Sequence, residues 1–194
     1  MDIVIKNLCK SFGEKQVLKN INAVIKQEQT TCIMGQSGVG KTTLLNIMMG
    51  FVKADSGEIF NIPQLKSAVF QENRLCESFS VFSNIKMAND TLCEDVIMQH
   101  LAAVGLDKEA MHKVSTLSGG MKRRVALVRA ILAQKNILFL DEPLKGLDEE
   151  TLENVKNYLR ENTKGLTVVM VTHQPEEAKA LGAEILYIKN GAAV

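Results

Sequence analysis

One stretch of the sequence has the residue types and spacing of a phosphate-binding loop. GQSGVGKT, residues 35–42, matches the pattern G-x-x-x-x-G-K-[ST] and lies between a buried apolar run and a helical pattern. Glycines there let successive backbone N–H groups point at a phosphate at the helix N-terminus. We predict a nucleoside triphosphate site in which Lys41 reaches the β- and γ-phosphates and the Thr42 hydroxyl binds Mg²⁺. The candidate nucleotide ligands in this stretch are Gly35, Gln36, Ser37, Gly38, Val39, Gly40, Lys41, Thr42 and Thr43.

A pair of acidic residues follows a second apolar run. In ILFLDEP, residues 137–143, Asp141 stands at the expected end of a buried strand and Glu142 comes next. A carboxylate at the end of a strand beside the phosphate loop can hold the Mg²⁺ shell, which is the role predicted for Asp141. Glu142 can orient and deprotonate an attacking water. Paired acids can also cap a following helix, but the upstream loop favours the chemical interpretation.

LSGGMKRRVALVRA, residues 117–130, places two glycines directly before a basic helix with an apolar stripe. Alone, this stretch fits either a nucleic-acid-binding helix or an element whose ligand is held by another chain. The formal net charge of the protein is +1, which provides no bulk field for nucleic acid and weakens the first interpretation. The buried stripe is predicted at Val125, Leu127, Val128 and Ile131. The solvated side is predicted at Lys122, Arg123 and Arg124.

Composition and length indicate a globular chain with its own core. The sequence has 194 residues, of which 46% are hydrophobic and 23% charged. No run approaches the roughly 20 apolar residues that a membrane-spanning helix needs, and the N-terminus lacks the pattern of a signal peptide. Four scattered cysteines show no metal-ligand spacing and predict reduced thiols. We therefore expect a cytoplasmic protein that meets a membrane only through a partner.

The order of expected elements predicts an α/β fold. In the second half, the buried strands NILFLDEP and LTVVMVTH alternate with the helices EETLENVKNYLREN and PEEAKALG, which is typical of a mostly parallel core sheet. Shorter strands come first, with a small antiparallel part between Gly50 and Gln71. Residues 72–117 interrupt the alternation with a helical pattern, in which Val96, Ile97, Leu101 and Val104 share one face. We expect residues 1–194 to form a single domain in which 72–117 is an inserted helical lobe.

Taken in order, these motifs resemble those of the ATP-binding-cassette (ABC) ATPases. LSGGMKRRVALVRA is similar to the signature motif of that family and precedes ILFLDEP by a single helix, as it does there. VFQENRL is similar to the Q-loop at Gln71, KGLD to the D-loop at Asp148, and VTH to the switch-histidine loop at His173. SFGEKQVL is similar to the segment whose aromatic residue, here Phe12, stacks on adenine. The resemblance implies a P-loop NTPase fold of the ABC-ATPase type that uses ATP and Mg²⁺.

The resemblance also implies two paired cassettes, with each ATP enclosed between the phosphate loop of one and the signature motif of the other. Backbone donors and a helix dipole then face the γ-phosphate of the partner's ATP. The residues implied at that shared site are Ser118, Gly119, Gly120 and Asp148. Catalytic roles are implied for Glu142, His173 and Gln71. The implied Mg²⁺ ligands are Thr42, Gln71 and Asp141.

By the same resemblance, the chain is expected to be the ATP-hydrolysing subunit of an ABC transporter, peripheral on the inner face of the cell membrane. Its implied partners are a second copy or a homologous cassette, a transmembrane permease and an extracytoplasmic solute-binding protein, with no nucleic acid. FQENRL and DEPLKGLD are most similar to the ATPases of importers for nitrate and sulfonates. The alternative is a soluble ABC ATPase of DNA repair or translation, but these usually carry an inserted coiled coil or a second cassette, and 194 residues leave no room for either. A GTPase would need N-K-x-D, which is absent, and a kinase would not explain LSGGM.

Three features depart from the family pattern. Phe12 replaces a more frequent Tyr, Gln174 follows the switch histidine where Asp is common, and the antiparallel part is short. None of them alters the phosphate chemistry. His100 and His112 are expected to be structural residues, one on a helix and one in a loop.

Overall fold

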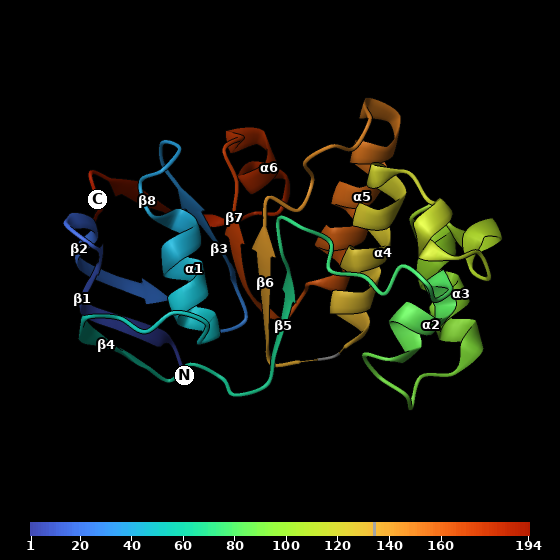
Figure 1. Cartoon of the computed structure of the whole chain (residues 1–194), viewed down its shortest axis with the longest axis horizontal. Helices are drawn as coiled ribbons and strands as arrows, with labels where there is room; N and C mark the ends of the chain where they lie inside the picture. The colour runs from blue at the N-terminus through green and yellow to red at the C-terminus, as the bar shows by residue number, and fades with distance from the viewer. Residues whose placement is uncertain (134) are drawn as a thin grey trace.

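The computed structural model describes residues 1–133 and 135–194. Its central element is a sheet with the strand order β5-β6-β7-β3-β8-β9 (Figure 1). The strands are β3 (Thr30–Met34), β5 (Lys66–Val69), β6 (Ile137–Asp141), β7 (Thr167–Val171), β8 (Glu184–Lys189) and β9 (Ala192–Ala193). All neighbouring pairs are parallel except β8 and β9, which form a hairpin. The predicted mostly parallel core is confirmed.

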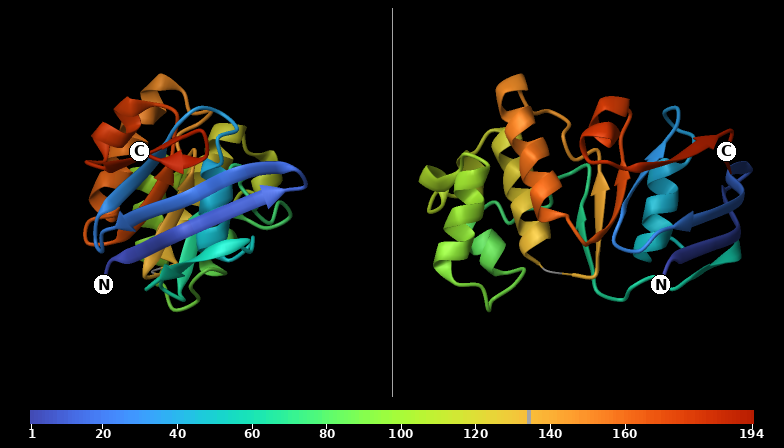
Figure 2. Two further views of the ribbon diagram at one scale, coloured as in Figure 1. Left: turned by 90° about the vertical axis from the view of Figure 1, so that its left-hand side faces the viewer. Right: turned by 180° about the vertical axis from the view of Figure 1, so that it is seen from behind.

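A second, antiparallel sheet with the order β2-β1-β4 covers one end of the molecule. It contains β1 (Ile3–Phe12), β2 (Lys15–Ile25) and β4 (Ser56–Phe60), and its long strands cross in front of α1 (Figure 2, left). The stretch between Gly50 and Gln71 contributes only β4 to this sheet. The next strand, β5, leaves it and pairs in parallel with β6 instead.

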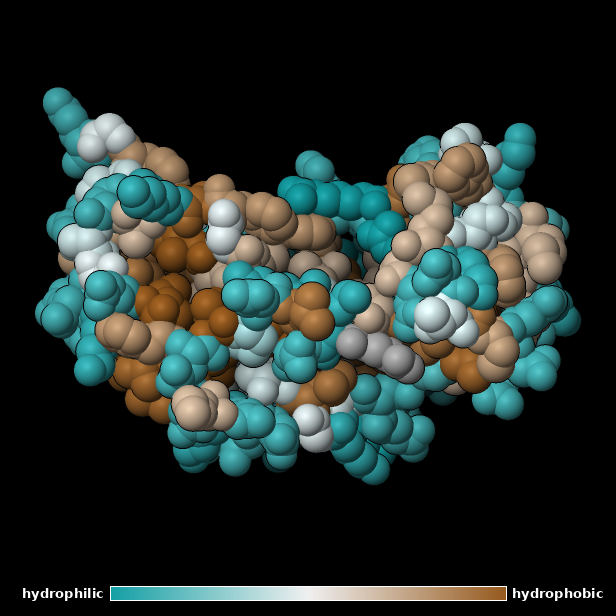
Figure 3. All heavy atoms as spheres, turned by 90° about the horizontal axis from the view of Figure 1, so that it is seen from below, coloured by the Kyte–Doolittle hydropathy of each residue, from teal (hydrophilic) through white to brown (hydrophobic). Residues whose placement is uncertain are grey.

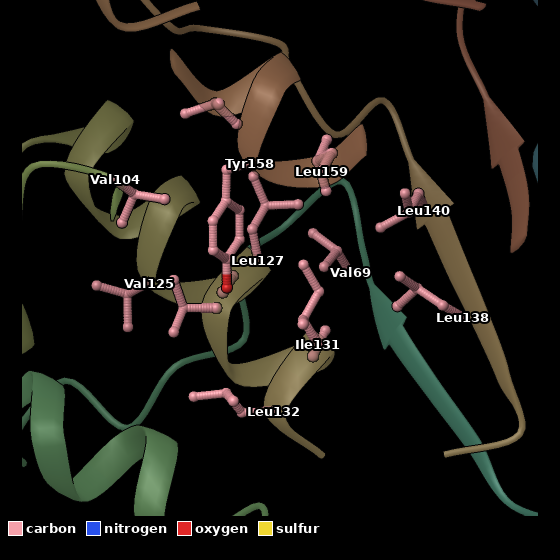
Figure 4. Close-up of a cluster of buried hydrophobic side chains, with 14 of the residues drawn as sticks. Val69, Val104, Val125, Leu127, Ile131, Leu132, Leu138, Leu140, Tyr158 and Leu159 are labelled. Atoms are coloured by element: carbon pink, nitrogen blue, oxygen red, sulfur yellow. The ribbon is translucent and has the colours of Figure 1, made fainter. Parts of the chain in front are cut away.

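Helices cover both faces of the central sheet, which explains the continuous apolar runs in its strands. One face of β6 presents Ile137 and Phe139 to α1 (Lys41–Met49) and the antiparallel sheet. The other face presents Leu138 and Leu140 to the helices on the opposite side (Figure 4). These helices are α4 (Gly119–Leu132), α5 (Glu149–Asn162) and α6 (Pro175–Ala180).

Residues 72–117 form a group of helices beyond α4, on the side away from the central sheet (Figures 1 and 2). They comprise α2 (Val81–Lys86), α3 (Glu94–Ala103) and the 3₁₀ turns Asp107–Glu109 and Val114–Thr116. The predicted inner face is present, since Ile97, Leu101 and Val104 are buried and Val96 packs against the core. As a result α4 lies between the sheet and this group, with apolar neighbours on both sides.

Seen from below, the outline of the molecule is hollowed between the end that carries the antiparallel sheet and the end that carries the helical segment (Figure 3). Apolar side chains gather on the half with the antiparallel sheet, and polar side chains surround them. Within the described residues, no helix is long and apolar enough to cross a bilayer. The four cysteines are free.

Candidate functional site

The phosphate loop connects the carboxyl end of β3 to α1, as the motif predicts. Gly40 is the N-cap of α1, with φ 109° and ψ 9°, a conformation that side chains disfavour. A Cβ at this position would lie 2.7 Å from Leu18 Cδ2 and 2.9 Å from Val17 Cγ1. The chain's own β2 therefore encloses the loop tightly and requires glycine here.

Lys41 is 5% exposed, and its ammonium group is turned into the phosphate loop. Its Nζ donates hydrogen bonds of 2.9 Å to the carbonyl oxygens of Gly35 and Gln36. Burial lowers the pKa of Lys41, while the carboxylates of Glu142 and Asp141 oppose that shift. The loop thus holds a cation within reach of any phosphate that its N–H groups bind.

Asp141 ends β6 and is 6% exposed. Burial raises its pKa and the neighbouring charge of Glu142 raises it further. The nearby Thr42 side chain acts in the opposite direction. Thr42, in the first turn of α1, thus lies close to the carboxylate that ends β6, so two of the three predicted Mg²⁺ ligands are brought together. The third, Gln71, is exposed and lines a cavity beside the phosphate loop.

Glu142 follows Asp141 and lies between two basic side chains. Its Oε1 is 3.2 Å from His173 Nε2, and its Oε2 is 2.8 Å from Lys145 Nζ. Burial acts to raise the pKa of Glu142, but the hydrogen bond and charge of Lys145, together with the charges of His173 and Lys41, outweigh it, so the pKa lies below its ordinary value. The backbone of Glu142 has φ 48°, a left-handed conformation that is uncommon for a non-glycine residue. Such strain is typical of functional positions.

These groups surround a cavity of about 660 Å³, a volume typical of small-ligand sites. The predicted site residues in its lining are Phe12, Ser37, Gly38, Gly40, Lys41, Thr42, Thr43, Gln71, Glu142 and His173. Phe12 ends β1 with its side chain 52% exposed, so its ring is available at the wall of the cavity. The carboxylate of Glu142, the ammonium groups of Lys41 and Lys145 and the phosphate loop thus surround one cavity. Such a set of groups can support phosphoryl transfer to water.

Eight other predicted site residues lie outside this lining. Gly35, Gln36 and Val39 belong to the phosphate loop, and Asp141 ends β6. The other four are Ser118, Gly119, Gly120 and Asp148. Ser118 caps α4, where its Oγ accepts from Met121 N at 3.2 Å, and Asp148 caps α5, where its Oδ1 accepts from Thr151 N at 2.8 Å. The hydrogen bond from the Thr151 backbone is the main reason that the pKa of Asp148 is lowered. Both caps leave the first N–H groups of their helices directed outward.

Gly119 differs from Gly40 in its surroundings. It has helical geometry, and a Cβ built on it has no neighbouring atom within 4 Å. Within the described residues, nothing therefore requires glycine at this position.

Two basic residues near the site were not identified as part of it from the sequence. Arg123 was expected in solvent but is 3% exposed, because α4 is covered by the sheet on one side and the helical segment on the other. Its guanidinium donates to the carbonyl oxygens of Asp141 and Glu142. Lys145 pairs with Glu142 three residues away in the loop after β6. The (i, i+3) spacing of Glu142 and Lys145 was a possible signal for that pair.

A scan against protein-family models matches residues 18–145 to the family described as ABC transporter. A solved bacterial ABC transporter cassette, determined as a dimer, superposes with a TM-score of 0.85 at 30% identity and covers 98% of this chain and 96% of that one. This confirms the predicted ABC-ATPase fold.

Curated relatives are similar over nearly the whole chain. The spermidine/putrescine import ATP-binding protein PotA of Fusobacterium nucleatum is 35% identical over 98% of the chain, which spans 55% of that relative's length. The bicarbonate transport ATP-binding protein CmpD of Synechococcus elongatus is 32% identical (98% of the chain, 76% of the relative). The aliphatic sulfonates import ATP-binding protein SsuB 2 of Pseudomonas fluorescens is 35% identical (97% and 74%). The names of these relatives contain different solutes, although their sequence identities to this chain are similar. The similarity therefore identifies a family and not a solute. The chain belongs to the ABC transporter family, as an ATP-binding cassette.

Proposed function

We propose that this chain hydrolyses ATP in the cavity beside Lys41 and Glu142 and thereby powers a separate transmembrane permease. The observation that carries the proposal is Glu142, a carboxylate with a strained backbone held next to His173 at the wall of the cavity. Its lowered pKa keeps it ionised at neutral pH, the form that accepts a proton.

ATP occupies the cavity with its adenine against Phe12 and its phosphates in the loop formed by residues 35–41. Lys41 exchanges its carbonyl partners for phosphate oxygens, which are stronger acceptors. Thr42, Asp141 and Gln71 would hold Mg²⁺. One buried carboxylate beside a hydroxyl fits this ion, which usually binds through one or two carboxylates together with substrate phosphates. When bound, the ion would supply positive charge that offsets the charge on the phosphate oxygens.

Hydrolysis uses Glu142 as the base. Its carboxylate orients a water and takes a proton as the water oxygen bonds to the γ-phosphorus and the bond to the bridging oxygen breaks, giving ADP and phosphate. His173 donates a hydrogen bond to a γ-phosphate oxygen. Gln71 contacts the same water. Because Gln71 directly precedes the helical segment 72–117, it connects the hydrolysis site to that segment.

A second cassette completes the site. Ser118 Oγ is an acceptor for Met121 N, so its own proton is free to be donated. The Ser118 hydroxyl and the N–H groups of Gly119 and Gly120 therefore provide hydrogen-bond donors at the N-terminus of α4. These donors lie outside the lining of this chain's own nucleotide cavity. The partner's ATP binds there, with Asp148 at the same interface. Similarity to a cassette determined as a dimer supports this arrangement.

The remaining assignments follow from the family and from the names of its members. Residues 1–194 act as one ABC ATPase domain, and the 72–117 lobe with the Gln71 segment receives a cytoplasmic helix of the permease. Relatives named as import ATP-binding proteins support an importer for a small solute, with an extracytoplasmic binding protein and a position on the inner face of the membrane.

Glu142→Gln tests the proposal, because the amide keeps the shape of the carboxylate and cannot accept a proton. ATP hydrolysis should fall by roughly 10²–10⁴-fold, the usual contribution of a general base. ATP binding persists, and an ATP-dependent dimer accumulates in size-exclusion chromatography with light scattering. Glu153→Gln, on the exposed side of α5, is the control and should keep wild-type turnover. Wild-type turnover by Glu142→Gln, or failure to dimerise with ATP, would overturn the assignment.

A further inference from the structure

Arg123 is a buried cation whose hydrogen bonds go to two different loops. All five of its N–H donors have an acceptor. Nε donates to Pro143 O at 3.0 Å, and Nη2 donates to Asp141 O at 2.6 Å and Glu142 O at 2.5 Å. Nη1 donates to Phe70 O and, at 3.2 Å, to Asn73 Oδ1. The first loop carries the candidate base Glu142, and the second carries Gln71.

This arrangement is costly for a residue that only fills space. Each hydrogen bond ends on a neutral carbonyl or amide oxygen, and burial lowers the pKa of Arg123 although the nearby carboxylates oppose it. A buried charge without a directly bonded counter-ion carries a desolvation penalty. Such a penalty is tolerated where fixed geometry matters, and the three consecutive acceptors, from the last residue of β6 to Pro143, are centred on the strained residue Glu142.

A second arginine of α4 holds the same Gln71 segment from the other side. Arg129 donates from Nη1 to Arg74 O at 3.0 Å and from Nη2 to Asn73 O at 3.3 Å. Arg74 in turn stacks 3.7 Å from the Phe70 ring centroid. The backbone from residue 70 to residue 74 is therefore tied to α4 at several points.

The same helix begins at the signature motif. Arg123 lies four residues after Gly119, which is about 6 Å along a rigid helix. A displacement of the α4 N-terminus is therefore transmitted to the carbonyl groups that fix Glu142 and to the segment that contains Gln71.

We infer that Arg123 is a positioning residue. It sets the backbone of Glu142 and the Gln71 segment relative to the signature helix, so that contact of Ser118 and Gly119 with a partner's ATP aligns the base in this chain's own cavity. This inference rests on the hydrolytic function proposed above. Arg123 is buried and is not part of the cavity lining, so it acts through the backbone groups that it holds.

The test replaces Arg123 by Met, which fills similar space without charge or donors. In steady-state kinetics of the full chain, kcat should fall by roughly 10²-fold, the usual effect of about 1 Å of misplacement. Nucleotide affinity should change by less than twofold, because the phosphate loop is untouched. In the nucleotide-free protein, backbone amides in 71–75 and 142–146 should exchange hydrogen faster.

Arg124→Met is the matched control. Arg124 also donates to backbone carbonyls, those of Val104 and Gly105, but these belong to the helical segment and not to either cavity loop. The control should lower thermal stability while kcat, measured well below the melting temperature, and exchange in both loops stay as in wild type. Arg123→Lys keeps the charge with fewer directed donors, so its kcat should lie between those of the wild type and Arg123→Met.

The outcomes separate this inference from the proposed function. If Glu142→Gln abolishes hydrolysis while Arg123→Met changes stability but neither kcat nor exchange in the two loops, the positioning role is wrong and the function stands. If Arg123→Met does not fold, Arg123→Lys is judged by the same criteria, and unchanged kcat with unchanged exchange overturns the inference. A wild-type protein without ATPase activity in the presence of its permease removes the proposed function itself.

Discussion

The two glycine-containing motifs, at residues 35–41 and 118–120, differ in how closely the rest of the chain packs against them. Around Gly40, β2 approaches so closely that a single added carbon would meet side-chain atoms within 3 Å. Around Gly119 the corresponding space is open. The fold of the chain explains the first glycine, whereas the described residues give no steric reason for the second.

The polar groups of the two motifs differ in the same way. Lys41 in the phosphate loop is buried and satisfied by carbonyl oxygens of that loop, so the loop is organised before nucleotide arrives. In the signature motif, Ser118 satisfies one N–H of its helix and the others point outward. A preorganised site and an open set of donors are the two halves expected of an ATP site shared between two cassettes.

The largest effect is expected from Gly40→Ala. A side chain at φ 109° costs about 1–3 kcal/mol, and the close contacts with Leu18 and Val17 add to it. For a chain of this size, that lowers the melting temperature by roughly 3–10 °C in calorimetry. ATP binding, followed by fluorescence of a labelled nucleotide, should weaken together with it.

Gly165→Ala separates strain from binding in that experiment. Gly165 also has a positive φ of 74°, but no atom lies within 4 Å of its added Cβ and it is not in the cavity lining. It should lose stability and keep ATP affinity. Equal ATP affinity for Gly40→Ala and the wild type would show that the phosphate loop is not the binding element.

Gly119→Asp should have the opposite combination of effects. A carboxylate in the first turn of α4 interacts favourably with the helix dipole, so the melting temperature should stay the same or rise by the equivalent of about 0.3–1 kcal/mol. Like-charge contact with a partner's phosphate costs several kcal/mol, so hydrolysis should fall by roughly 10²-fold or more. ATP binding to the isolated chain is unaffected.

Gly119→Asn has nearly the same shape without the charge and should lose less activity than Gly119→Asp. Light scattering with ATP measures dimer formation for each variant. If Gly119→Asp and Gly119→Asn lower hydrolysis equally, position 119 does not face a phosphate. If neither variant lowers hydrolysis, the signature motif contributes nothing to it.

Much of the site could be predicted because it follows locally from sequence. Continuous apolar runs ending in Gly35 and Asp141 predict buried parallel strands, and parallel strands bring their carboxyl ends to one edge of a sheet. The distance from Thr42 to Asp141 along the chain is therefore no obstacle, and in the structure the Thr42 side chain lies close enough to influence the pKa of Asp141.

The side-chain partners of the site could not be predicted in the same way. The interpretation of Arg123 as solvated assumed that one side of α4 faces water, but α4 is covered on both sides. Whether a helix has an exposed side depends on what the 72–117 segment packs against, which is tertiary information. The (i, i+3) spacing of Glu142 and Lys145 was a signal for their pair, but the left-handed backbone of Glu142 has no signal in the sequence.

The smallest effect is expected where the signature motif approaches the loop after β6, which begins with Glu142. A Cβ on Gly120 of the signature motif would lie 3.4 Å from Gly146 O, and the neighbouring residue Lys145 is paired with Glu142 of the nucleotide cavity. The Lys145 side chain is 62% exposed, and exposed ion pairs contribute about 0–1 kcal/mol, so Lys145→Met should change turnover at pH 8 by less than about fivefold.

Its effect should appear in the pH profile instead. Lys145 lowers the pKa of Glu142, so its removal raises that pKa. A base works only when ionised, and the acid limb of kcat should therefore move to higher pH. Lys145→Arg keeps the cation and should keep the wild-type acid limb. An acid limb that stays in place for Lys145→Met would mean that another group controls it, and that the ion pair between Lys145 and Glu142 does not set the protonation of the base.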